Sequence, residues 1–403
     1  MNLNIFLVAG ALIAGGLGLN SDKDPEVILQ EITAHRAKAI KEAQDAKKPI
    51  DAVALIAETK AMAVKAIEGV EPSKVEPAKA YAWAQVFQQA GKFENIEELC
   101  DQYMKSNPTK EQSFRAHMLC LTAYHQLKQY DKAAMLVDHL EPTDATSQLA
   151  LANQVLGYIA VPVSKAQGVE AGLKLVDQVA GSLPKTMPDE RQNLSLNTTR
   201  ARVYSTKALI YSEAGDKAKA KEMIEAGAKD ETIPENVRRT MRMELTRMTI
   251  VSSVAPEIPV EKTYGEFKSF ESLRGKVVLI DFFAHWCGPC IAAFPDVRKM
   301  YDDLKGQGLE IIGVTRYYGY YGTERNMAPD VEFGKMAEFM EKHKMNWPVV
   351  YSDNSAFEAY GVSGIPTVVV IGRDGKVHEL KVGYSAASFA EFRAKVEKLL
   401  AQK

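Results

Sequence analysis

Val277–Cys290, which reads VVLIDFFAHWCGPC, is the stretch of the chain from which the fold can be predicted. Its first seven residues are apolar except for one acid, a pattern typical of a strand that is buried on both faces of a parallel sheet. A helix is predicted to follow directly, over Gly288–Leu304. Cys287 and Cys290 therefore lie where a buried strand ends and a helix begins.

This position favours thiol chemistry. The first turn of a helix carries unpaired amide N–H groups and the positive end of the helix dipole, both of which stabilise a thiolate over a thiol. A cysteine there is expected to have a lowered pKa and to be nucleophilic near neutral pH. The two-residue spacer places the sulfur of Cys290 one helical turn further in, where it can close a disulfide with Cys287.

Other uses of a Cys-x-x-Cys pair can be tested on the sequence. A zinc site would need two further ligands, and no second Cys-x-x-Cys or Cys/His cluster is present. A c-type haem site would have a histidine directly after the second cysteine, where Ile291 stands. A peroxiredoxin-type peroxidase would have a threonine where Ala284 stands. Of the possible uses of the Cys-x-x-Cys pair, a redox dithiol remains, and no metal is expected.

Asp281 is the one acid inside the apolar strand. If its side chain is buried, desolvation should raise its pKa, which would suit a group that carries a proton. The alternative is an aspartate at the edge of a strand that points to solvent.

The rest of the C-terminal region alternates between strands and helices, which predicts an α/β fold. Val254–Val260 (VAPEIPV) has two prolines and is the predicted domain boundary. Asp374-Gly375 predicts a tight hairpin turn. The remaining predicted strands are 309–315, 348–352, 367–371 and 376–381, and the remaining predicted helices are 331–344 and 386–400.

The quoted stretch closely resembles thioredoxin, and Leu273-Arg274-Gly275-Lys276 ahead of the strand resembles the extracytoplasmic TlpA/ResA-like branch of that family. The resemblance covers about 150 residues. It implies a thioredoxin fold and thiol–disulfide exchange. It also implies a role for each matching residue: Cys287 attacks, Cys290 resolves, Asp281 relays a proton, Trp286 borders the sulfurs, the cis-proline loop Ile365-Pro366-Thr367 pairs with substrate, and Gly383 lies beside the substrate groove.

Residues 24–253 have a helical pattern that is interrupted at short intervals by glycine and proline. Ala80–Pro108 resembles a tetratricopeptide (TPR) repeat, with an early Trp and an Ala-Gly-x-Phe turn, although the spacing to the next turn is not fixed. Hairpins of this kind bury their apolar faces by stacking. The predicted organisation is a signal peptide or membrane anchor over residues 1–20, an all-α TPR-like region over 21–253 and a thioredoxin-like domain over 254–403.

The leader prediction depends on Ile5–Leu19, an uncharged run that is short for a transmembrane helix and suits the core of a signal peptide. No Lys or Arg precedes this run, and an uncleaved anchor or a disordered tail are the alternatives. We expect an extracytoplasmic, periplasmic location, with the protein exported or anchored by its N-terminus.

Three features leave alternatives open. Cys100 and Cys120 flank a predicted helix–helix turn and could form a disulfide or be two small core residues. His285 could stabilise the Cys287 thiolate or be a loop residue that faces solvent, and the second is expected. The tyrosines of the segment after the strand 309–315 could line a peptide-binding face or pack over that segment; they are Tyr317, Tyr318, Tyr320 and Tyr321.

The sequence therefore predicts a protein thiol–disulfide oxidoreductase that reduces disulfides of extracytoplasmic proteins and is recharged by a membrane electron-donor protein. The alternative is a helical-repeat adaptor whose redox domain acts as isomerase or oxidase on the proteins it holds, with a protein or peptide partner on the helical region. A net charge of −2 gives no reason to expect nucleic acid, and the absence of a glycine-rich nucleotide loop predicts no cofactor.

Overall fold

The structure is a computed structural model that describes residues 24–46, 48 and 50–402 of the chain. The chain divides into two compact units, one up to Leu196 and one from Asn197. The predicted leader over residues 1–20 lies outside the described residues. No helix among the described residues is long and apolar enough to cross a membrane.

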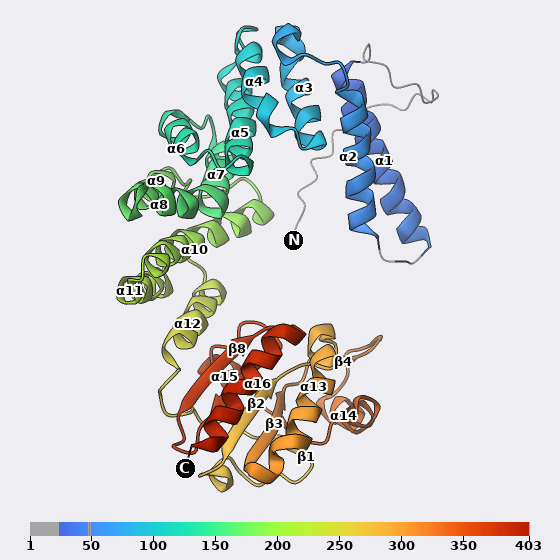
Figure 1. The fold of residues 1–403 in the computed structure, drawn as a ribbon, viewed down its shortest axis with the longest axis vertical. Helices are drawn as coiled ribbons and strands as arrows, with labels where there is room; N and C mark the ends of the chain where they lie inside the picture. Colours follow the sequence, from blue (N-terminus) through green and yellow to red (C-terminus); the bar gives the residue numbers. More distant parts are fainter. Residues whose placement is uncertain (1–23, 47, 49, 403) are drawn as a thin grey trace. The chain divides into compact units, whose positions relative to one another are not determined.

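The first unit is built of helices, and each packs mainly on the helices next to it in the chain (Figure 1). Asp24 caps the first helix by accepting a hydrogen bond from the Glu26 N–H, and Thr109 and Gln112 form the capping box that the sequence predicts. The helices of this unit are α1 Pro25–Asp45, α2 Ala52–Ala66, α3 Pro77–Ala90, α4 Ile96–Met104, α5 Lys110–Gln126, α6 Tyr130–His139, α7 Ala145–Gln154, α8 Ala160–Gln167, α9 Val169–Gly181 and the start of α10 Glu190–Glu213, with short η1 Pro72–Lys74, η2 Phe93–Asn95 and η3 Val155–Ile159.

The second unit contains the rest of α10, two further helices and a domain with a six-stranded mixed sheet. The strand order is β1-β6-β3-β2-β7-β8, with β2, β3 and β6 parallel and the other strands antiparallel to their neighbours. The elements are α11 Lys217–Lys229, α12 Glu235–Thr249, β1 Lys262–Tyr264, η4 Glu271–Leu273, β2 Val277–Phe282, α13 Gly288–Leu304, η5 Lys305–Gln307, β3 Leu309–Thr315, β4 Tyr320–Tyr321, β5 Glu324–Arg325, α14 Pro329–His343, β6 Val349–Tyr351, α15 Asn354–Ala359, β7 Thr367–Ile371, β8 Val377–Val382 and α16 Ala386–Ala401.

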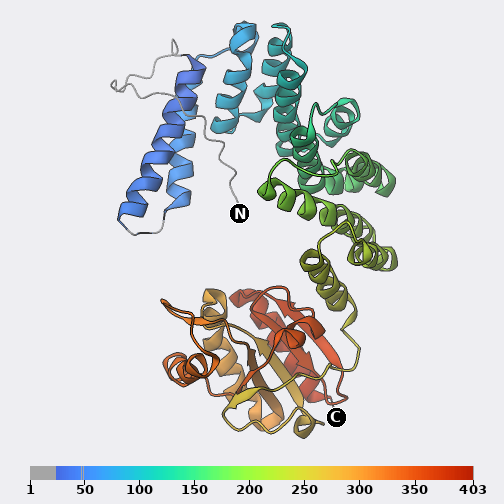
Figure 2. The same cartoon turned by 180° about the vertical axis from the view of Figure 1, so that it is seen from behind.

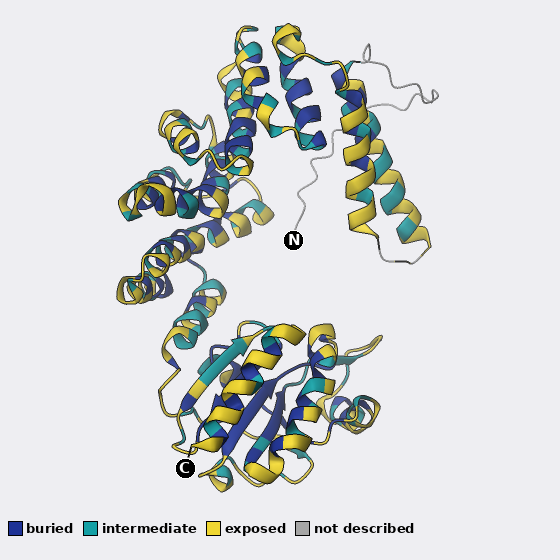
Figure 3. Cartoon of the chain, in the orientation of Figure 1, coloured by how far each residue is buried: buried dark blue, intermediate teal, exposed yellow. Residues whose placement is uncertain are grey.

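Both faces of this sheet are covered, which is why β2 is buried along its whole length (Figure 3). Alternate residues of β2 point to opposite faces, and Val277 and Leu279 belong to the core under α13, α14 and α16. Val278 and Ile280 belong to the core on the other face, seen from behind in Figure 2, which includes Phe357 of α15. The predicted class, a helical region followed by an α/β thioredoxin-fold domain, is confirmed by this arrangement.

Helix α12 packs against α15, so the last helix before the sheet domain is fixed to that domain. Gly361, directly after α15, makes this close approach possible: a Cβ at this position would lie 2.5 Å from the Met243 carbonyl oxygen and 2.8 Å from the Arg247 amide nitrogen. Its φ of +66° also disfavours any other residue. An ion pair between Arg239 and Glu358 joins the same two helices.

Gly361→Ala should therefore destabilise the second unit more than the same substitution at a left-handed glycine that has open space around it. Gly375→Ala is the matched control, because Gly375 has a φ of +73° but nothing within 4 Å of a Cβ. We expect Gly361→Ala to lose about 2 kcal/mol more free energy of unfolding than Gly375→Ala, since it alone creates a backbone clash. Urea unfolding followed by Trp286 and Trp347 fluorescence in a Trp83→Phe background measures the difference. Equal losses would contradict the α12 contact.

Candidate active site

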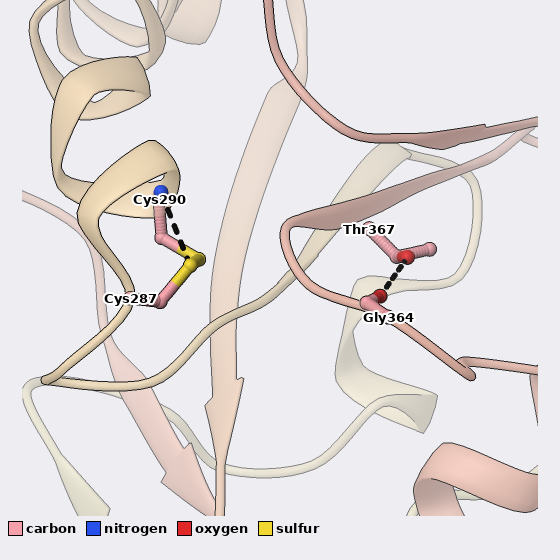
Figure 4. The surroundings of a disulfide bond; sticks show 4 residues. All are labelled: Cys287, Cys290, Gly364 and Thr367. Carbon is pink, nitrogen blue, oxygen red and sulfur yellow. Dashed lines mark hydrogen bonds between the residues drawn. A yellow bond between two sulfur atoms is a disulfide. The ribbon is translucent and has the colours of Figure 1, made fainter. Parts of the chain in front are cut away.

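Cys287 and Cys290 form a disulfide at the start of α13, with the two sulfurs 2.02 Å and the two Cα atoms 5.2 Å apart (Figure 4). Strand β2 ends at Phe282, and the short segment after it carries the chain to the helix. Both cysteines are buried, whereas Trp286 beside them is 48% exposed. The surface beside the disulfide therefore carries an exposed aromatic ring.

Cys287 is the N-cap residue of α13. Its sulfur accepts a hydrogen bond from the Cys290 amide at 3.2 Å, in the way that a Ser or Asp side chain caps a helix. When the disulfide is reduced, the same amide and the helix dipole lie next to the Cys287 sulfur and stabilise its thiolate. The geometry thus favours Cys287, and not Cys290, as the nucleophile.

Asp281 is buried in β2, so the alternative of a solvent-facing strand edge is wrong. Strand alternation places its side chain on the α13 face of the sheet, the face whose core includes both cysteines. Gly313 and Val368 are its neighbours on the flanking strands. Burial raises the pKa of Asp281 from 3.8 to about 7. A carboxyl group with this pKa can gain or lose a proton near neutral pH.

The loop before β7 contains a cis peptide bond between Ile365 and Pro366. Two hydrogen bonds hold this loop: the Gly383 amide donates to the Pro366 carbonyl at 2.8 Å, and the Thr367 hydroxyl donates to the Gly364 carbonyl at 2.7 Å (Figure 4). Gly383 has a φ of +80°, which a glycine adopts without strain. No hydrogen bond joins the backbone of Ile365 to another described residue, so its N–H and C=O can pair with an added strand.

His285 is buried, which makes the expected solvent-facing loop position wrong. Its ring lies 5.1–5.7 Å from the rings of three tyrosines, Tyr318, Tyr320 and Tyr321. Desolvation lowers the pKa of His285, although the Glu332 carboxylate opposes the shift. A neutral imidazole is therefore favoured, and this weakens the interpretation of His285 as a cation beside the thiolate.

The structure adds Glu332 to this cluster, a residue that the sequence reasoning missed. Its buried carboxylate accepts the Tyr318 amide at 2.8 Å and the Gly319 amide at 2.8 Å, and lies 3.8 Å from His285 Nε2. Glu332 thereby attaches the inserted segment to the active-site loop. The three tyrosines pack around His285, which agrees with the alternative that these side chains pack over the inserted segment. The only sign of Glu332 in the sequence was its position as an acid in the first turn of the predicted helix 331–344.

Cys100 and Cys120 are free and buried in the helical region. The Cys100 sulfur donates to the Ala116 carbonyl at 3.4 Å, and a hydrogen bond with Cys100 is the main cause that raises the pKa of Cys120. The structure therefore has two core thiols here and no disulfide between them. Across the described part of the chain, no group of three or more His, Cys, Asp or Glu side chains is placed to hold a metal ion.

The comparisons with known proteins agree with this site. The Redoxin family model matches residues 250–399. The thiol-disulfide oxidoreductase ResA of Bacillus subtilis is 34% identical over 134 residues, which cover 32% of this chain and 66% of that protein. ResA of Geobacillus thermodenitrificans is 28% identical over 33% of this chain and 70% of that protein. The match thus spans slightly less than two thirds of the Bacillus subtilis relative and about a third of this chain.

Among solved structures, the thioredoxin domain of a thiol-disulfide oxidoreductase from Bacteroides vulgatus is 23% identical, covering 37% of this chain and 97% of that chain with a TM-score of 0.30. The Redoxin model match assigns a redoxin domain to the C-terminal region, which is similar in sequence to ResA-type thiol–disulfide oxidoreductases.

The burial of Asp281 predicts a pH-dependent stability. Between its ordinary pKa of 3.8 and the folded value of about 7, the folded protein holds a proton that the unfolded chain has released, so stability falls as the pH rises through this range. Asp281→Asn should remove this fall. Urea unfolding of the oxidised proteins should show the variant gaining about 4 kcal/mol on the wild type between about pH 4 and pH 8. A difference that is constant with pH would mean that Asp281 ionises freely in the folded state.

Proposed function

We propose that this chain is a protein thiol–disulfide oxidoreductase that reduces disulfide bonds of extracytoplasmic partner proteins. The observation that carries the proposal is the Cys287–Cys290 disulfide at the N-terminus of α13, with one sulfur in the N-cap position. Asp281 on the same face of the sheet and the unpaired backbone of Ile365 support it. The similarity of residues 250–399 to the redoxin family is consistent with this activity.

In the proposed reaction the reduced protein begins with a Cys287 thiolate and a Cys290 thiol. The thiolate attacks one sulfur of the client's disulfide, so the client's S–S bond breaks, a mixed disulfide forms, and the leaving client thiolate takes a proton from water. The Cys290 thiol then loses its proton and attacks the Cys287 sulfur. This step releases the second client thiolate and forms the Cys287–Cys290 disulfide. The client gains two electrons and the dithiol loses two.

Asp281 is proposed to take the proton of Cys290 in the second step. A carboxylate with an ordinary pKa would be a poor acceptor for a thiol proton, and the raised pKa of about 7 makes Asp281 a better one. The client is proposed to lie along the loop that contains Ile365, Pro366 and Thr367, with Trp286 and Gly383 at its borders. Pairing with the Ile365 backbone would hold the client as an added strand.

Further parts of the proposal concern the surroundings of the protein. We assign residues 21–253 to a TPR-like region and 254–403 to the redox domain. We propose that residues 1–20 are a signal peptide or anchor that brings the protein to the periplasm. There a membrane electron-donor protein would return two electrons to the Cys287–Cys290 disulfide, because each client disulfide that is reduced leaves this pair oxidised.

An adaptor function is the second candidate, and the contact between α12 and α15 is the observation that favours it. Helix α12, which belongs to the same compact unit as the redox domain, can hold a client in a defined place relative to the disulfide. In this case the redox domain would act as an isomerase or oxidase on the held client.

Cys290→Ala is expected to trap clients as mixed disulfides with Cys287, because the step that releases them needs the Cys290 sulfur. Non-reducing electrophoresis of the full chain incubated with an oxidised test protein such as insulin measures the trapped fraction. Cys287→Ala is the matched control and should trap nothing, since Cys290 lies inside the helix and lacks the N-cap position that stabilises a thiolate at Cys287. Equal trapping by both variants would contradict the assignment of Cys287 as the attacking residue.

The reduction potential of the Cys287–Cys290 pair decides whether the protein reduces its clients or donates disulfides to them. Gly288-Pro289 between the cysteines and the acid at Asp281 resemble the reducing members of the thioredoxin family. We therefore expect a potential near or below roughly −270 mV in a glutathione or dithiothreitol redox buffer. A value towards roughly −120 mV would instead mean that the protein donates disulfides, as the adaptor alternative requires.

A further inference from the structure

A pocket of about 320 Å³ lies between α12 and the sheet domain. Helix α12 supplies one wall, and the end of β3, α15 and the chain just before the cis-proline loop supply the rest. The lining residues used below are Asn236, Arg239, Arg316, Asn354, Phe357 and Ser363.

Arg316 is the distinctive group of this pocket. It directly follows β3, and its guanidinium lies 5.2 Å from the ring centre of Tyr318 and 5.2 Å from that of Phe357. Stacking on two rings limits the motion of the side chain, so less conformational entropy is lost when it binds a ligand. Among the described residues Arg316 has no carboxylate partner, whereas Arg239 is paired with Glu358. The pocket therefore has one uncompensated positive charge.

Side-chain contacts connect the pocket to the residues beside the redox site. Tyr318, on which Arg316 stacks, also contacts Trp286 edge-on with ring centres 5.4 Å apart, and Trp286 is next to Cys287. On the other side, Ser363 lines the pocket and directly precedes the loop Gly364–Thr367. On the proposed function, a polypeptide that lies along this loop has Ser363 and the pocket that it lines as near neighbours.

We propose that this pocket binds an acidic side chain of the client polypeptide through Arg316, and so selects clients that carry Asp or Glu near the disulfide. A guanidinium matches a carboxylate with two parallel hydrogen bonds, and the amides of Asn236 and Asn354 are further donors in the lining. Arg316 is then a specificity-determining residue, and α12 is a wall of the client site. This inference rests on the function proposed above and names its substrate class.

The test uses pairs of disulfide-bonded peptides that are identical except for Glu or Gln at one position, with that position scanned on both sides of a cysteine. The measured quantity is the second-order rate at which the reduced full-length protein reduces each peptide. We expect the wild type to prefer the Glu peptide by about tenfold at its best position, the size of a charge-assisted hydrogen bond in a partly buried site. Raising the ionic strength should reduce this ratio.

Arg316→Gln should bring the Glu/Gln rate ratio to about one, and Arg316→Lys should retain part of it because it keeps the charge without the planar fork. Arg325→Gln is the matched control: Arg325 stacks on Tyr320 of the same inserted segment but does not line the pocket, so its ratio should stay at the wild-type value. Because each ratio compares two peptides on one variant, a general loss of activity does not change it.

The outcomes separate the two proposals. A wild type that reduces Glu and Gln peptides equally at every position, or a preference that Arg316→Gln retains, would overturn the acidic-client inference while leaving thiol–disulfide exchange intact. The same holds for a preference that does not respond to salt. A wild type that reduces none of the peptides and no oxidised test protein would overturn the proposed function, and with it the inference.

Discussion

The position of Cys287 at the N-cap of α13 is the constraint on which the redox site depends. A sulfur in this place accepts the Cys290 amide and lies at the positive end of the helix dipole, so the helix that holds the disulfide also activates it. The N-cap can lie there only because β2 ends at Phe282 against a covered sheet. Burial of β2 on both faces thus determines where the chemistry is placed.

The same burial has a cost at Asp281. An acid in the middle of a strand with two covered faces is desolvated, and the free energy that would be needed to ionise it appears as its raised pKa. A leucine at this position would make a better core. On the proposed function, the acid on the face that carries the cysteines serves as a proton acceptor for the dithiol, which a leucine could not do.

Much of this domain could be predicted from the sequence because its strongest signals are local. The apolar run over Val277–Phe283 gave β2, and the predicted helix 288–304 has the bounds of α13. The strand 309–315 agrees with β3. Short elements were missed, namely β1, the β4–β5 hairpin and α15, since two to six residues have too little periodicity to be recognised.

The environment of His285 could not be predicted for a different reason. Its burial depends on tyrosines more than thirty positions further along the chain and on Glu332 beyond them, and such contacts leave no local pattern. The position of Arg316 had a weak signal. It follows β3, which is parallel to β2, so the ends of both strands meet at the same edge of the sheet as the Cys287 loop. Its stacking on Phe357 and the approach of α12 were not accessible without the fold.

A redox site of this kind recognises little of its client by itself. On the proposed function, sulfur exchange and backbone pairing at the Ile365 loop would be available to any extended segment with a disulfide, so discrimination would have to come from side chains further away. Helix α12 is close enough to supply them because Gly361 lets it approach the backbone after α15. On the proposed function, the contact between α12 and the sheet domain therefore links the choice of client to the chemistry performed on it.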